Sequence, residues 1–142
     1  MGVNVTPRQR DFIARHRVAR LATADAEGRP HVIPVCYVLD GDVIYSAIDR
    51  KPKRVGAKAL KRVRNIAENP RVALVIDDYA EDWSALAYVL VFGAAILVES
   101  GSERQSAERM LREKYPQYET MLAQASPVLK ISIEKVTGWG AV

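Results

Sequence analysis

The sequence of 142 residues predicts a mainly β protein, a mostly antiparallel barrel with helices packed against its outside. Three observations support this fold class. About six apolar segments have the pattern of β-strands, and short turns rich in Asp and Gly join the first of them. Only three or four segments have helical spacing, and strands do not alternate strictly with helices. A hydrophobic content of 49% and the length suit one folded domain, which we expect to span residues 1–142.

The first third of the chain predicts one helix followed by three strands. The helix is expected at 7–15, and the strands at 18–24, 30–39 and 43–47. Thr6 can cap the helix, and Pro7 suits its first position. Asp25–Gly28 and Asp40–Asp42 provide short turns between the strands. These three strands are therefore expected to form an antiparallel meander.

The rest of the chain predicts three helices and three strands. The helices are expected at 55–68, 103–114 and 117–123, and the strands at 71–77, 86–99 and 128–136. Pro70 ends the first of these helices, because the residue before proline avoids the helical conformation. Ser102 can cap the next one. Gly93 is expected to bend the long strand in which it lies.

Basic residues are concentrated in one part of the sequence. The whole chain carries a net charge of +4, but residues 50–64 contain eight basic residues and no acidic one. The remainder has 13 basic and 17 acidic residues, so it carries −4. Lys58, Lys61 and Arg62 are spaced so that they can converge on an anion such as a phosphate. The alternative is a solvated basic helix face. A nucleic-acid partner is not expected, because single-strand binding usually needs aromatic residues among the basic ones.

The sequence contains no recognisable catalytic motif. His16 and His31 lack metal-ligand spacing, and we expect both to be structural. The one cysteine, Cys36, excludes an internal disulfide and is expected to be a buried, inert thiol. Trp83 follows an acidic loop, and it can either pack under the core or stack on a planar ligand. An enzyme of this composition would need a cofactor to supply its chemistry.

No secretory signal is visible at the N-terminus. The longest uncharged run, 83–98, is too short to span a bilayer. We therefore expect a soluble, cytoplasmic protein that contacts no membrane and holds no metal.

Three segments resemble one known family. They are RVARLATADAEGRPHVIPVCYVLDGDVIYSA, KRVRNIAENPRVALVID and DWSALAYVLVFGAAILVE, which cover most of residues 12–99. Together they resemble the pyridoxamine 5′-phosphate oxidase-like split β-barrel family, and within it the branch that depends on the deazaflavin coenzyme F420. This resemblance implies a split barrel, a homodimer, and a flavin or deazaflavin bound at the dimer interface.

The resemblance also implies which residues would bind the cofactor. The phosphate would meet a basic pair at Lys61 and Arg62. The end of the expected strand at 43–47 would run beside the phosphate and ribityl chain of the cofactor. The middle of the second expected strand, at 30–39, would lie against the cofactor ring. A basic loop would bind the anionic tail of the cofactor, and an aromatic residue would stack on its ring. The expected cofactor-binding residues are therefore Lys61, Arg62, Tyr45, Ser46, Ala47, Val35, Cys36, Lys51, Lys53 and Trp83.

One departure from the oxidases, at two positions, affects the expected cofactor. Those enzymes hold FMN with an Arg and a Lys on the second strand, and Val32 and Tyr37 stand at the matching positions here. The resemblance therefore implies an F420-dependent oxidoreductase that transfers a hydride to or from a small organic substrate. An FMN-dependent oxidase or reductase, or a non-catalytic binding protein such as a haem-handling relative, is the alternative. Tyr37 or Tyr88, or solvent, would supply a proton.

Overall fold

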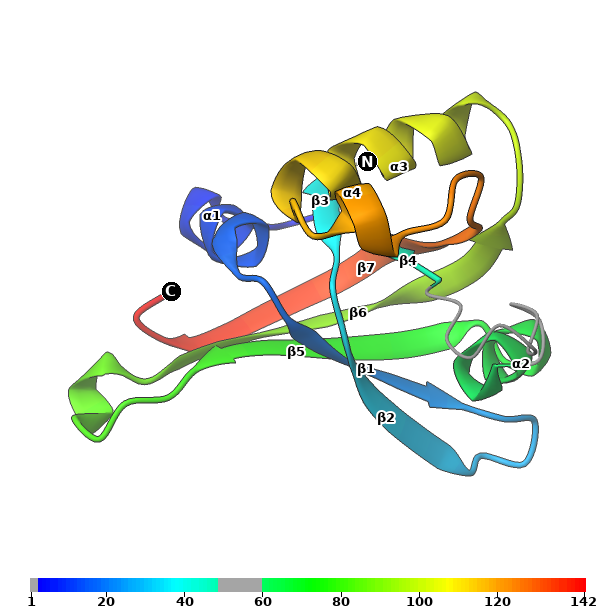
Figure 1. Cartoon of the computed structure of the whole chain (residues 1–142). Coiled ribbons are helices and arrows are strands. Elements are labelled where there is room, and N and C mark those ends of the chain that lie inside the picture. Colours follow the sequence, from blue (N-terminus) through cyan, green and yellow to red (C-terminus); the bar gives the residue numbers. More distant parts are fainter. Residues whose placement is uncertain (1–2, 49–59) are drawn as a thin grey trace.

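The computed structural model of the chain describes residues 3–48 and 60–142, which form seven strands and four α-helices around two apolar clusters (Figure 1). In chain order the elements are α1 (Pro7–Arg15), β1 (Ala19–Ala24), β2 (Pro30–Val35), β3 (Val38–Asp40), β4 (Val43–Ala47), α2 (Lys61–Glu68), β5 (Arg71–Asp78), a short 3-10 helix η2 (Trp83–Ala85), β6 (Ala87–Val98), α3 (Ser102–Lys114), α4 (Tyr118–Met121) and β7 (Val128–Gly140).

The described strands form one sheet in the order β2-β1-β5-β6-β7-β4-β3, and every pair is antiparallel. β2 and β3 follow each other in the chain but lie at opposite edges of the sheet. The sheet therefore curls into a barrel that is split between these two edges. Figure 1 shows α3 and α4 above β4 and β7. It shows α2 beside the start of β5 and the end of β6. The predicted fold class, an antiparallel barrel with flanking helices, is confirmed.

The predicted three-strand meander is wrong. The expected strand at 30–39 divides into β2, which pairs with β1, and β3, which pairs with β4. The break falls at Tyr37, whose backbone N–H donates to Tyr115 Oη at 2.9 Å and whose hydroxyl donates to the Ile13 carbonyl at 2.5 Å. The Tyr115 hydroxyl also donates to the Tyr37 carbonyl at 2.9 Å, so both main-chain groups of Tyr37 bond to this side chain instead of to a neighbouring strand. The chain leaves one sheet edge here and joins the other.

Most of the other expected elements are confirmed. α1 has the predicted Thr6 cap, and Gln9 completes a capping box. A register shift between Phe92 and Gly93 confirms the predicted bend in β6. The part of the expected helix at 55–59 lies outside the described residues, and α2 begins at Lys61.

Two boundaries differ from the prediction. β7 continues to Gly140, beyond the expected end at Val136, because it pairs with β6 over the whole of β6. Ser102 is the first residue of α3 and not its cap. Gly101 caps this helix with φ +99°, a conformation that glycine adopts without strain.

Two clusters of buried side chains hold the fold together. The larger fills the barrel and includes Phe12, Leu21 and Ile131. The smaller lies between α3, α4 and β4 and includes Tyr45 and Leu111. Within residues 3–48 and 60–142, no helix has the length and apolar character that crossing a bilayer requires.

Candidate anion and cofactor site

A pocket of about 360 Å³ opens where the two halves of the split barrel meet the start of α2. β2, β4 and α2 each contribute to its wall. The lining residues are Ile33, Pro34, Val35, Ser46, Ala47, Leu60 and Arg62. We call it the split pocket. It brings together four of the ten predicted cofactor-binding residues: Val35, Ser46, Ala47 and Arg62.

The first turn of α2 beside this pocket suits an anion. Leu60 stands at the cap position and has no side-chain oxygen to accept from the first backbone N–H groups. The first four residues include Lys61, Arg62 and Arg64 and no acid. The partial positive charge of a helix N-terminus normally favours acidic residues there, so these cations are unfavourable in isolation. A bound phosphate would satisfy both the N–H groups and the cations.

The two members of the predicted basic pair have different surroundings. Arg62 lines the split pocket. Lys61 is turned toward the β1–β2 hairpin, with its Nζ 3.8 Å from Asp25 Oδ2 and its side chain 43% exposed. Asp25 is already held by Arg29, which approaches to 2.7 Å. Arg62 is therefore the residue better placed to meet an anion in this pocket, and Lys61 stands at its edge.

The side chains at the end of β4, which were expected to run beside the cofactor, lie on two different sides of the fold. Ser46 and Ala47 reach the split pocket, and the Ser46 hydroxyl donates to the Cys36 carbonyl at 2.8 Å. Tyr45 instead packs in the smaller cluster and donates to Glu103 at 2.5 Å. Burial and this bond raise the pKa of Tyr45. The half-buried Cys36 side chain packs against the same cluster. The structure thus places the side chains of Tyr45 and Cys36 away from the pocket.

Three further residues were predicted to bind the cofactor. Lys51 and Lys53 lie outside the described residues. Trp83 is on η2, 70% exposed, at the opposite end of the molecule from α2 (Figure 1). Its exposure contradicts the prediction that Trp83 packs under the core, and stacking on a planar ligand stays a prediction.

The two tyrosines considered as proton donors also differ. Tyr37 is fully buried, and its hydroxyl is bonded to a main-chain carbonyl, so it faces no open site. Burial also raises its pKa. Tyr37 as a donor is therefore wrong. Tyr88 is 38% exposed and stacks on Trp139 on the outer side of the sheet.

Sequence reasoning missed several residues around the pocket. Leu60 and Ile33 supply apolar wall, which a sequence pattern alone does not assign to one cavity. Asn65 was also missed. It is fully buried on the inner side of α2 and donates to Thr23 at 3.0 Å, while its Oδ1 has no hydrogen-bond partner among the described residues. A polar residue among the apolar positions of a helix is the signal that could have identified it.

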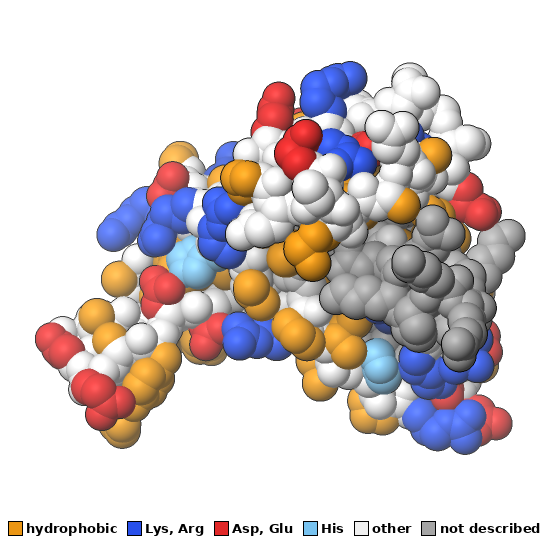
Figure 2. All heavy atoms as spheres, in the orientation of Figure 1, with side chains coloured by type: hydrophobic (Ala, Val, Ile, Leu, Met, Phe, Trp, Pro, Cys, Tyr) orange, Lys and Arg blue, Asp and Glu red, His pale blue; other side chains and the backbone are white. Residues whose placement is uncertain are grey.

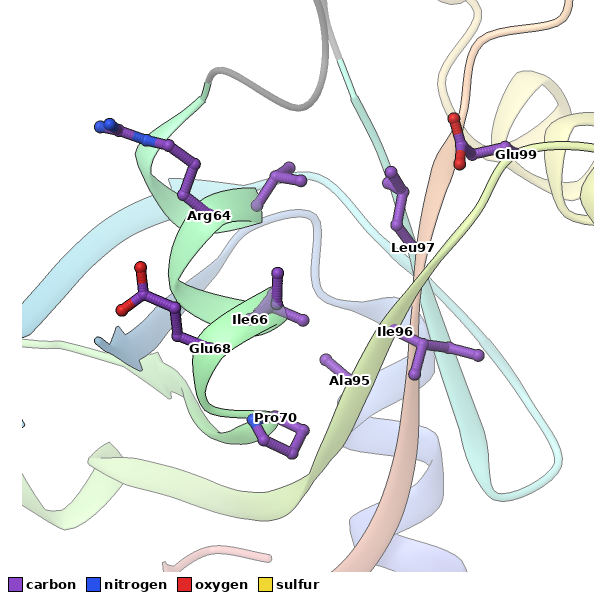
Figure 3. Close-up of a pocket in the computed structure, with 10 residues that line it drawn as sticks. Arg64, Ile66, Glu68, Pro70, Ala95, Ile96, Leu97 and Glu99 are labelled. Carbon is purple, nitrogen blue, oxygen red and sulfur yellow. The ribbon is translucent and has the colours of Figure 1, made fainter. Parts of the chain in front are cut away.

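A larger groove of about 610 Å³ lies on the other side of α2, against the end of β6 (Figure 3). None of the ten predicted site residues lines it. Ile66, Pro70 and Leu97 form its apolar wall, and Figure 3 shows the charged ends of Arg64 and Glu68 directed away from it. An anionic cofactor needs charged and polar contacts, so the smaller split pocket is the better candidate.

The fold and the pocket define a split β-barrel with a candidate anion site at the barrel opening. The pyridoxamine 5′-phosphate oxidase family matches residues 5–140, and the chain belongs to that family. The resemblance seen in the sequence is therefore confirmed at the level of the family.

Individual relatives carry different functions. A 5a,11a-dehydrotetracycline/5a,11a-dehydrooxytetracycline reductase from Streptomyces rimosus is 32% identical over 111 residues, which is 75% of each chain. The crystal structure of HutZ, a haem storage protein from Vibrio cholerae, has a TM-score of 0.73 at 18% identity and covers 99% of this chain and 95% of its own. The conserved hypothetical protein Rv2991 from Mycobacterium tuberculosis has a TM-score of 0.72 at 25% identity, with 92% and 81% covered.

Proposed function

We propose that the protein is an oxidoreductase that uses coenzyme F420 to transfer a hydride to or from a small organic substrate. One observation carries the proposal: Arg62 and the N-terminus of α2, which has no side-chain cap and no acid in its first turn, lie at a preformed pocket. The reductase relative from S. rimosus supports oxidoreductase chemistry. The family membership supports a flavin-like cofactor.

The residues of the split pocket suit the parts of such a cofactor. Arg62 and the first N–H groups of α2 would hold the phosphate. Ile33, Val35 and Leu60 would provide an apolar wall and exclude water. When bound, the deazaflavin ring would supply or accept the hydride. The chain itself then has to bind and orient the cofactor and shield it from water, which agrees with the absence of a recognisable catalytic motif in the sequence.

The second strand favours F420 over FMN. Val32 is 63% exposed on the outer face of the sheet, and Tyr37 is fully buried in the larger apolar cluster. Neither can replace the Arg and Lys with which the oxidases of this family hold FMN. FMN remains the alternative cofactor, and a direct comparison of the two ligands separates them.

The proposal includes a homodimer, because the sheet has an uncovered apolar face that a second copy of the chain would cover. Pairing in register places Val32, Ala22, Ala73 and Phe92 in one row across four strands. Tyr88 stacks on Trp139 near the end of the same face, with ring centroids 6.0 Å apart. Exposed apolar surface of this kind marks an interaction site, and a homodimer with the cofactor at its interface would bury it.

The test is a fluorescence titration of the purified protein with F420 and with FMN. We expect F420 to bind more tightly. Arg62→Ala should weaken its binding by about 1.5–3 kcal/mol, the value of a charge-assisted contact. Arg64→Ala is the matched control, because it removes the same charge from the same helix on the side away from the pocket.

Three results would contradict the proposal. Equal losses in the Arg62→Ala and Arg64→Ala variants would mean that only the general charge of α2 matters. Tight FMN binding without F420 binding would reassign the cofactor. Binding of neither ligand would remove the proposed activity.

A further inference from the structure

His16 stands where α1 ends, and each of its two ring nitrogens faces an acceptor. Its Nδ1 lies 2.7 Å from the Phe12 carbonyl oxygen, and its Nε2 lies 2.6 Å from Asp78 Oδ1 at the end of β5. The ring stacks on Phe12 with the two centroids 3.9 Å apart, and the side chain is 12% exposed. Both distances are those of direct hydrogen bonds, so the ring is fixed between α1 and β5.

The two acceptors determine how many protons the ring must carry. A carbonyl oxygen and an ionised carboxylate can only accept, so each bond needs an N–H group of the histidine. A neutral imidazole has one N–H, and either tautomer would leave a nitrogen lone pair facing an oxygen lone pair. The imidazolium has two N–H groups and completes both bonds. The position at the end of α1 adds to this preference, because a helix C-terminus favours a cation.

Other charged groups on the surrounding elements do not replace Asp78. They are Asp11, Arg15, Arg17, Arg20, Asp77 and Lys114. Both acids in this set already pair with an arginine, at 3.3 and 3.4 Å. Arg17 and Lys114 lie over the Tyr115 ring, 4.9 and 5.5 Å from its centroid. Figure 2 shows Lys and Arg side chains gathered on the part of the surface where Figure 1 places α1. The surrounding charge is mainly positive, so the two acceptors, and not the wider field, hold the second proton.

α1 is fastened near both of its ends. Arg10 donates to the Gly41 carbonyl at 2.6 Å and to Asp42 Oδ1 at 3.0 Å, in the turn between β3 and β4. Arg10 holds the pKa of Asp42 below its ordinary value, so this attachment stays charged at neutral pH. β3 and β4 lie at one end of the strand order, whereas β5 lies toward the other end, beside β1 and β2. The helix therefore bridges the two sides of the split barrel.

We propose that α1 is a proton-dependent clasp: protonated His16 ties the helix to β5, and loss of one proton releases this end while Arg10 keeps the other end attached. The inference does not depend on the proposed function, because the clasp needs no cofactor. β2 and β4, which contribute to the wall of the split pocket, lie on the two sides that the clasp joins.

NMR and amide hydrogen exchange of the whole chain test the clasp between about pH 5 and about pH 9, a range that spans the ordinary titration of histidine. Nitrogen-15 shifts of His16 report whether one or both ring nitrogens carry a proton. Amide exchange, corrected for the intrinsic rate at each pH, reports opening of the last turn of α1. As the pH rises, we expect the protection of residues 14–16 to fall about tenfold or more while His16 loses its second proton, the effect of losing one charge-assisted bond. Protection that stays constant while His16 deprotonates would overturn the inference.

Asp78→Asn separates the contact from the proton. The amide of the new side chain can donate to Nε2, so a neutral His16 with its proton on Nδ1 makes both bonds. We expect α1 of this variant to stay protected over the whole pH range. Asp77→Asn is the matched control, because it removes the neighbouring acid of the same strand, which pairs with Arg20, and should keep the wild-type pH dependence. A wild-type pH dependence in Asp78→Asn, or its loss in Asp77→Asn, would contradict the clasp.

His16→Gln removes the titrating group itself. We expect low protection of residues 14–16 at every pH, equal to that of wild type at high pH, with circular dichroism reporting that the fold is retained. His31→Gln changes the other histidine of the chain and should leave the pH dependence unchanged. A pH dependence that survived in His16→Gln would assign it to another group and overturn the inference.

Discussion

Asp25 organises the β1–β2 hairpin next to the start of α2. Its carboxylate accepts from the backbone N–H groups of Glu27 and Arg29 and from the Arg29 guanidinium. These bonds, above all those from Arg29, lower the pKa of Asp25 from 3.8 to about 2. The ionised carboxylate therefore stabilises the folded hairpin and also faces Lys61 at the edge of the split pocket.

Stability should depend on Asp25 in a defined pH range. A carboxyl whose pKa is lower in the folded protein stabilises it above its ordinary pKa, and this contribution is lost as the pH falls through the folded value. The unfolding free energy of wild type should therefore exceed that of Asp25→Asn above about pH 4, and the difference should shrink between pH 4 and pH 2. Urea unfolding followed by circular dichroism measures both proteins at each pH.

Asp11→Asn provides the control for this prediction. Asp11 is 74% exposed and pairs with Arg15 on the surface of α1. Such pairs contribute little to stability. A wild-type advantage over Asp25→Asn that persisted unchanged to pH 2 would show that hairpin packing, and not the ionised carboxylate, is responsible.

At the scale of elements, β6–β7 is the longest strand pair among the described residues and contains a register shift at Gly93. A Cβ at this position would lie 2.3 Å from the Ser132 carbonyl oxygen, which belongs to the paired strand. Main-chain atoms of a central strand cannot move aside easily. Glycine is therefore needed here for close approach of the two backbones.

Gly93→Ala should destabilise the fold by about 1–3 kcal/mol, as expected for steric overfilling in a packed sheet. The measurement is the unfolding free energy in guanidinium chloride. Ala94→Gly is the neighbouring control, with an expected loss of about 0.5–1 kcal/mol from added backbone freedom. Equal losses for the two variants would contradict the close approach between the strands.

At the scale of the whole molecule, the uncovered apolar face of the sheet is the surface on which the proposed dimer would form. Phe92 lies near the middle of that face, 38% exposed, with Lys135 Nζ 6.0 Å from its ring centroid. A second positive charge here would have to be buried without a partner in the interface, which is costly.

Phe92→Lys should therefore dissociate the proposed dimer into monomers without unfolding the chain. Sedimentation equilibrium gives the association constant, which we expect to fall at least a hundredfold, and circular dichroism reports the fold. Met121→Lys is the control on the opposite part of the surface, and it should leave association unchanged. A Phe92→Lys protein that remained a full dimer would place the interface elsewhere.

Local sequence rules predicted much of this fold. Thr6, Pro7 and Pro70 act on their own neighbours, so the helix limits that depend on them follow from chain chemistry alone. The bend at Gly93 was predicted for the same reason. The division of the second strand was not, because the break at Tyr37 depends on a bond from Tyr115, 78 residues away in the chain.

The same distinction applies to the site. The sequence by itself determined that a basic segment exists, because eight basic residues without an acid occur in residues 50–64, and it determined the family through its motifs. Only the tertiary structure decided that Arg62 and Ser46 share a pocket, that Tyr45 is turned away from it, and that Trp83 lies at the other end of the molecule. Charge is a local property of the chain, whereas the meeting of distant side chains depends on which strands pair and on how the sheet closes.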